Sequence, residues 1–198
     1  MSNGISLVDR HTDATQCLIL ESAVVLLERH GVKDLTVRAV ARHAGMSERT
    51  VFRYFATRDD FLDAVASEVQ AQLETPSPPG TIDALPSYPG LLYPCFEAKA
   101  DLVKAALHTE LFERLREAVG DYRWREVGAL VAACGVHRTP RDQRIAATNI
   151  CYYLTATTWH YYRFYFGLSL KDTVAAARQA IEREIQGIRP VVTRNLAS

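Results

Sequence analysis

Apolar residues recur at intervals of three and four along most of the chain, which is the period of an amphipathic helix. The pattern predicts an all-α fold, with tails over residues 1–11 and after residue 190. The predicted helices run over residues 12–30, 37–44, 48–54, 58–73, 100–107, 109–134, 140–166 and 170–188.

The segment 36–60 carries three closely spaced helix-start signals. Thr36, Ser47 and Thr57 each stand where a hydroxyl can accept an unpaired backbone N–H of a first helical turn. Gly45 follows the first short helix, at a point where the chain must turn and a left-handed conformation is needed. Two short helices joined by a tight turn predict a helix-turn-helix, whose second helix can lie in the DNA major groove.

The same segment resembles the DNA-binding region of the tetracycline-repressor (TetR) family of regulators. The matching residues are Leu35–Arg38, Val40–Ala41, Ala44–Ser47, Thr50, Phe52, Tyr54–Phe55 and Thr57–Asp59. The resemblance is dense over residues 12–73 and looser beyond. It implies a three-helix head at residues 12–57 and a ligand-binding and dimerisation body at residues 58–190. Phe52 replaces the usual Tyr, and Arg58 replaces the usual Lys.

Charge is distributed unevenly along a chain whose net charge is zero. Between Arg29 and Arg58 there are seven cations and two anions, so this segment is positive and the remainder is negative. A basic patch on an otherwise acidic protein favours phosphate binding by one face. The alternative is a solvated helical face, but the coincidence with the helix-turn-helix favours the patch.

Base contacts are expected from the second helix of the motif and from the start of the first. Arg38 and Arg49 are the leading base readers, because a guanidinium can donate twice to guanine O6 and N7. Arg53 could do the same or hold a phosphate. Thr50 could touch a thymine methyl or a phosphate, and Glu48 could accept from cytosine N4.

Phosphate contacts are expected from Thr36, Tyr54, Thr57 and Arg58, the last two at the positive end of the fourth helix. The resemblance implies contacts for Val37 and Phe52 as well. Val51 and Phe55 are assigned to the core and Arg42 to solvent. For Phe52 both roles stay open, packing in the core and contact with DNA. The complete predicted DNA-contact set is Thr36, Val37, Arg38, Ser47, Glu48, Arg49, Thr50, Phe52, Arg53, Tyr54, Thr57 and Arg58.

Six of the eight prolines fall within residues 74–94. They exclude a helix interior over residues 75–80 and predict a loop, followed by a short or broken helix near 82–96. In the next part, Gly120–Asp121 could bend or divide the long helix.

Apolar and aromatic residues surround the helix predicted at 151–166 on every side, so every side must be covered. A chain of this size has few elements left to do so, and a partner subunit would supply the cover. The final helix adds a regular apolar seam from Val174 to Ile188. The resemblance independently implies that the last two long helices pair into a four-helix homodimer interface.

Several aromatic residues of the body could line a ligand chamber. The resemblance implies a small ligand among these helices, and scarce charge there favours a mostly apolar or aromatic one. For any single residue, core packing is the alternative. His160 and nearby Tyr hydroxyls could orient the ligand. The candidates are Tyr93, Phe96, Phe112, Trp124, Tyr153, Trp159 and His160.

Other function classes find little support. No Cys-x-x-Cys or Cys/His metal spacing occurs, and Cys17, Cys95, Cys134 and Cys151 are expected to be buried free thiols, with a redox switch as the alternative. Phosphate-loop, dinucleotide, zinc-protease and serine-hydrolase motifs are absent. We therefore expect no enzyme, cofactor or metal. Without a signal pattern or a membrane-length apolar run, a cytoplasmic location is expected.

Together these features predict a homodimeric transcriptional regulator, a repressor, that binds a near-palindromic double-stranded DNA operator. Half-site centres would lie roughly 34–36 Å apart or a multiple of that. A ligand in the body would favour a dimer shape that no longer matches the operator. The alternatives are an all-helical enzyme and a ligand-binding protein whose head does not bind an operator.

Overall fold

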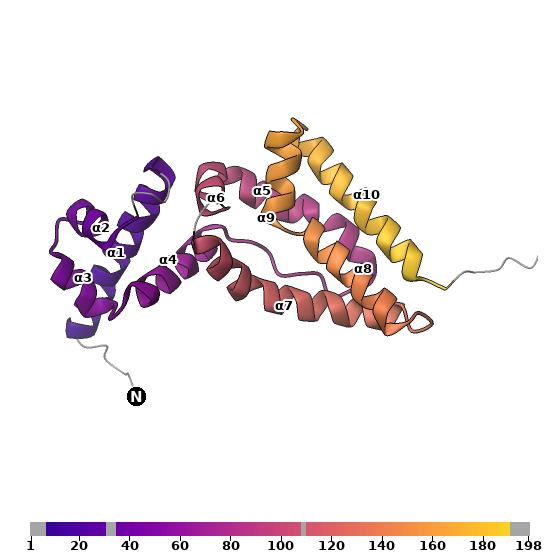
Figure 1. Cartoon of the computed structure of the whole chain (residues 1–198), viewed down its shortest axis with the longest axis horizontal. Coiled ribbons are helices and arrows are strands. Elements are labelled where there is room, and N and C mark those ends of the chain that lie inside the picture. Colours follow the sequence, from indigo (N-terminus) through magenta and orange to yellow (C-terminus); the bar gives the residue numbers. More distant parts are fainter. Residues whose placement is uncertain (1–6, 31–34, 108–109, 191–198) are drawn as a thin grey trace, which may run out of the picture. The chain divides into compact units, whose positions relative to one another are not determined.

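A computed structural model describes residues 7–30, 35–107 and 110–190. Within these ranges every regular element is helical, which confirms the all-α fold (Figure 1). The chain forms two compact units, one of Met1–Glu74 with Lys99–Ala118 and one of Thr75–Ala98 with Val119–Ser198. Packing thus groups part of the predicted body with the head, while the functional boundary at residue 57 stays a prediction.

The first unit is a helical bundle centred on one long helix. This helix, α1 (Leu7–His30), packs against α2 (Val37–His43), α4 (Arg58–Gln72) and α6 (Ala100–Leu107), and α2 packs against α3 (Glu48–Tyr54) (Figure 1). The prediction of a tail over residues 1–11 is wrong for residues 7–11, which are helical. No Pro or Gly separates Leu7 from the predicted cap at Thr12, so nothing local stops the helix from extending.

The predicted helix caps of the helix-turn-helix are confirmed. Thr36 Oγ1 accepts the Ala39 amide at 3.1 Å, and Ser47 Oγ accepts the Thr50 amide at 3.1 Å. Thr57 and Asp60 form a reciprocal capping box, each side chain accepting the other's amide. Gly45 takes the predicted left-handed conformation, with φ of +69°. These local interactions fix where α2, α3 and α4 begin.

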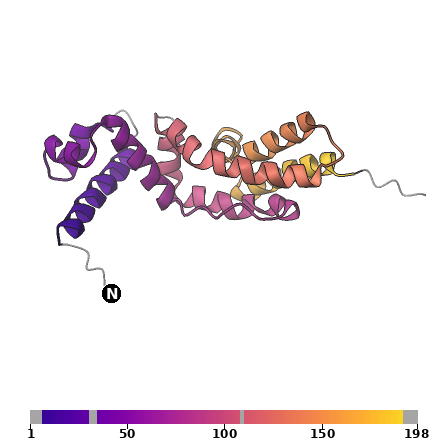
Figure 2. The same ribbon diagram turned by 90° about the horizontal axis from the view of Figure 1, so that it is seen from below.

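The second unit is built around α10 (Leu170–Ile188), which packs against α8 (Pro140–Tyr153), α5 (Pro89–Ala98) and the 3₁₀ helix η2 (Ile82–Ser87) (Figure 1 and Figure 2). Ser169 caps α10, its hydroxyl accepting the Asp172 amide at 3.1 Å. The proline-rich loop and the broken helix after it are also confirmed. The long helix α7 (Leu111–Cys134) is continuous through Gly120 and contributes to both units.

The prediction of one helix over residues 140–166 is wrong. The helix ends with α8 at Tyr153. A new helix, α9 (Ala156–His160), follows, and it continues into a π-helical segment, η3 (Tyr161–Tyr165). At the break, Thr158 donates its hydroxyl to the Tyr152 carbonyl at 2.6 Å, and Arg123 donates Nη1 to the Leu154 carbonyl at 2.7 Å. Side chains thus take the carbonyls that a continuous helix would pair internally.

The cysteines are less buried than expected. Cys17 is exposed, and Cys95, Cys134 and Cys151 are partly buried, so the prediction of four buried thiols is wrong. All four are free, and burial raises the pKa of Cys151 to about 11. A small apolar residue on an exposed stretch of α1 has no need of cover, which is why composition alone misplaced Cys17.

Replacing Gly45 with Ala should destabilise the first unit by about 1 kcal/mol, because the left-handed backbone strains any residue with a Cβ. Urea-induced unfolding followed by circular dichroism measures the change. Gly187→Ala is the control, since that helical position has an ordinary φ and no described atom within 4 Å of an added Cβ. Equal losses in both variants would contradict the role of the turn conformation.

Candidate nucleic-acid interface

Helix α3 has one buried and one exposed side. Val51 is fully buried, and Phe55, directly after the helix, is 4% exposed. Both therefore belong to the core, as predicted. The other side presents Glu48, Arg49 and Arg53 to solvent. Packing of the apolar side fixes which polar groups α3 can present to a ligand.

The exposed cations differ in their surroundings. Arg38 on α2 and Glu48 on α3 approach to 4.0 Å, an exposed pair that contributes little to stability. Arg53 lies over the Tyr54 ring, with 5.2 Å from its guanidinium carbon to the ring centroid. Arg49 forms no ion pair with a described residue. Its guanidinium thus retains its donors for an external acceptor.

Three predicted contact residues already have a structural task. The Thr36, Ser47 and Thr57 hydroxyls accept backbone amides as helix caps. The Ser47 hydroxyl also lies 2.9 Å from that of Thr50, leaving the Thr50 methyl as its less engaged group. A role for these residues in DNA binding stays a prediction.

The two apolar members of the predicted set lie in different environments. Phe52, for which the sequence left both core packing and DNA contact open, is 45% exposed. Val37 is 9% exposed and packs with the core, so a DNA contact there is left to its backbone. The exposed ring of Phe52 extends the surface of α3 without adding charge.

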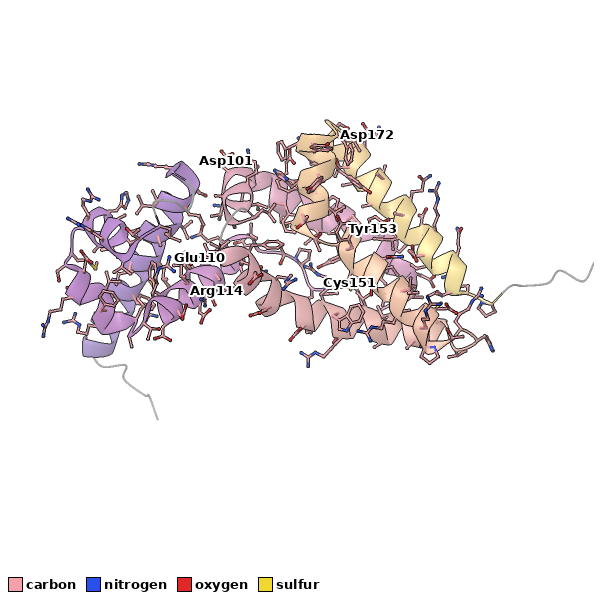
Figure 3. The ribbon with its side chains drawn as sticks, viewed as in Figure 1. Asp101, Glu110, Arg114, Cys151, Tyr153 and Asp172 are labelled. Carbon is pink, nitrogen blue, oxygen red and sulfur yellow. The ribbon has the colours of Figure 1, made fainter. Side chains whose placement is uncertain are left out.

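Three ion pairs join the start of α4 to the start of α7. Arg58 donates to both carboxylate oxygens of Glu110, one of them at 2.6 Å. Figure 3 labels Glu110 and Arg114, which lie at the start of α7. Arg114 pairs with Asp59 at 2.6 Å and with Asp63. The Arg58 hydrogen bonds lower the pKa of Glu110, and the same bonds raise the pKa of Arg58. The pair is therefore ionised at neutral pH. Glu110 thus accepts the hydrogen bonds of the Arg58 guanidinium, which the sequence predicts to bind a phosphate.

The candidate ligand residues do not form one group. Tyr93, Phe96 and Trp159 are buried in the second unit, with ring centroids of Phe96 and Trp159 5.9 Å apart. Tyr93 donates its hydroxyl to the Tyr153 carbonyl at 2.5 Å, and His160 packs against Trp159. This cluster is packed like a core. Ligand contact by its members stays a prediction.

The other two candidates lie elsewhere on α7. Phe112 belongs to the first unit, and the buried cluster belongs to the second. Trp124 is 38% exposed and borders a groove of about 310 Å³ between α7 and α8. The sequence pattern could not separate these two from the others, since aromatic type does not encode which side of a long helix is covered.

Two charged groups of the second unit were missed by sequence reasoning. Glu97 on α5 accepts from the Trp159 indole at 3.0 Å and pairs bidentately with Arg163. Arg123 holds the Leu154 carbonyl, while its Nε is buried and has no hydrogen bond within the described structure. Charge is thus less scarce in the body than the sequence indicated. Both interactions join residues more than 30 positions apart, and no local pattern signals them.

The described parts of the chain contain no group of three His, Cys, Asp or Glu side chains placed to hold a metal ion. Among these same residues, no helix combines the length and the apolar character that crossing a membrane requires.

Residues 19–65 match the family model of bacterial regulatory proteins, tetR family. A curated relative, named as the mycofactocin biosynthesis transcriptional regulator MftR of Mycobacterium tuberculosis, is 39% identical over 54 residues. That match covers 27% of each protein, so the chain spans about a quarter of the length of this relative. The family-model match thus covers the helix-turn-helix and the first half of α4.

Solved structures extend the likeness to the whole fold. A TetR transcription regulator from Haloarcula marismortui shares a TM-score of 0.60 at 18% identity, covering 89% of this chain and 98% of that one. The crystal structure of BioQ with its double-stranded DNA operator has a TM-score of 0.53 at 20% identity, and the match covers 83% of this chain and 98% of that one. At such identities the likeness concerns the fold.

Replacing Glu110 with Gln should tighten DNA binding about two- to fivefold, because an exposed ion pair of this kind is worth a few tenths to 1 kcal/mol and its loss releases Arg58. Fluorescence anisotropy with a labelled duplex measures the affinity. Glu113→Gln, in the first turn of α7, removes the same charge without breaking a described ion pair. An equal gain in both variants would contradict competition for Arg58.

Proposed function

We propose that this chain, which belongs to the tetR family of bacterial regulatory proteins, acts as a homodimeric repressor released from its DNA operator by a small effector. The observation that carries the proposal is the exposed side of α3, where Arg49 and Arg53 project from a helix whose other side is buried. The family and the DNA-bound fold of BioQ support double-stranded DNA as the partner.

In this proposal α3 enters the major groove. Arg49 donates to a guanine edge, and Arg38 reads a neighbouring base from the start of α2. Thr36, Tyr54 and Arg58 hold phosphates on either side, which positions α3 without reading sequence. Arg58 must exchange Glu110 for a phosphate, so DNA binding and the α4–α7 ion pairs compete.

Dimerisation is supported by apolar groups that the described chain leaves uncovered. Tyr152 at the end of α8 and Tyr161, Phe164, Tyr165 and Phe166 in and after η3 are each between 45% and 73% exposed. An apolar patch of this kind marks a protein–protein contact. A second copy would cover it by a twofold operation and place two heads on one operator.

The effector part of the proposal rests on the body. A ligand that prefers a dimer shape unfit for the operator releases the DNA, and a 100-fold effect requires about 2.7 kcal/mol of differential binding. The predicted effector is small and mostly apolar or aromatic. The buried cluster around Trp159 would admit it only by rearranging.

Replacing Arg49 with Ala should weaken binding to a cognate site by about 1–3 kcal/mol and relax the preference at one base position. Binding to a set of single-base variants of the site measures both effects. Arg42→Ala is the matched control, because Arg42 is an exposed cation on α2 assigned to solvent. A uniform loss on every sequence would instead make Arg49 a phosphate contact.

Replacing Tyr165 with Glu should raise the dimer dissociation constant at least about tenfold, because the interface would then bury an unpaired charge. Sedimentation velocity across a concentration series measures the constant. Leu91→Glu on α5 introduces the same charge at a position that is 63% exposed and outside the aromatic patch. Dissociation by both variants alike, or by neither, would contradict the proposed interface.

A further inference from the structure

The groove between α7 and α8 is hollow because small side chains line facing stripes of the two helices. On α7, Trp124, Gly128 and Ala132 follow one another at intervals of four residues and lie on one side. On α8, Ala147 contributes the corresponding small side chain. The volume of about 310 Å³ lies at the lower end of the range for small-molecule sites.

Gly128 contributes most directly to the space. Glycine in a helix interior costs about 1 kcal/mol relative to alanine. Apart from its chain neighbours and the adjoining backbone of α7, no described atom lies within 4 Å of the position that a Cβ would take at Gly128, so packing within the chain does not require a glycine there. A larger side chain at this position would project into open space and fill the groove.

The groove is positively charged. Arg125 lines it from α7 and Arg144 from α8, and no acidic side chain does so. Neither arginine forms an ion pair with a described residue. Trp124 supplies an aromatic wall beside these two cations. A planar aromatic ring stacks on an indole, and a carboxylate accepts charge-assisted hydrogen bonds from guanidinium groups.

From this arrangement we propose that the α7–α8 groove binds a small planar aromatic carboxylate. The ring lies against Trp124 over Gly128, and the carboxylate lies between Arg125 and Arg144. This site differs from the buried cluster around Trp159, where the aromatic rings pack together and the charges of Glu97 and Arg163 pair with each other. The inference deepens the effector part of the proposed function, on which its regulatory meaning rests, while the binding itself requires no DNA.

Titration of the full-length protein with 2-naphthoate tests the site. Isothermal calorimetry should show saturable binding, and quenching of Trp124 fluorescence should give the same dissociation constant. The neutral 2-naphthamide should bind at least about tenfold more weakly, because it cannot form the charge-assisted hydrogen bonds. Equal affinities for the two compounds, or no binding of 2-naphthoate, would overturn the proposal.

Two variants locate the binding. Gly128→Leu should abolish it by filling the groove, whereas Ala129→Leu, on an exposed position of the same helix that does not line the groove, should leave it unchanged. Arg144→Gln should weaken 2-naphthoate about tenfold and leave 2-naphthamide unaffected. Thermal unfolding checks that each variant is folded.

Persistence of 2-naphthoate binding in Gly128→Leu would place the ligand elsewhere and overturn the site. DNA binding by the same preparation is measured separately. Intact DNA binding without 2-naphthoate binding overturns only the groove, while the reverse result overturns only the proposed repressor.

Discussion

Burial of one side of α3 determines what its other side can do. A helix of seven residues is too short to be stable alone, so its orientation depends on contacts made by Val51 and Phe55. Phe55 meets Phe61 of α4 edge to face, with ring centroids 5.6 Å apart. The Ser47 cap then sets where α3 begins. Arg49 and Arg53 are therefore displayed on a fixed surface, as direct readout of a base edge requires.

Arg58, at the start of α4, has a partner within the chain that would compete with a DNA phosphate. Glu110 presents to Arg58 the two acceptor oxygens that a DNA phosphate would present, and Arg114 fastens the adjoining turns of α4 to α7. In the proposed function, a movement of α7 would change how firmly Arg58 is held. The affinity of the head for DNA is thereby connected to the helix that also borders the α7–α8 groove.

Sequence reasoning succeeded where the signals are local. The starts of α2, α3 and α4 follow from Thr36, Ser47 and Thr57, whose hydroxyls accept amides three residues away. It failed where the deciding partner is distant. The Arg58–Glu110 pair spans 52 positions. At the break after α8, Arg123 lies 31 positions from Leu154, whereas the Thr155 cap of α9 is a local signal that the sequence analysis missed. Periodicity describes which side chains are apolar, and it contains no information on which carbonyl a remote donor will take.

The central claim is that two copies of this basic head read one symmetric DNA site. Selection of bound duplexes from a random pool by the purified full-length protein, followed by sequencing, tests it most directly. The account predicts enrichment of an inverted repeat whose half-site centres lie roughly 34–36 Å apart along the helix, or a multiple of that. Enrichment of no motif, or of a single half-site without symmetry, would contradict it.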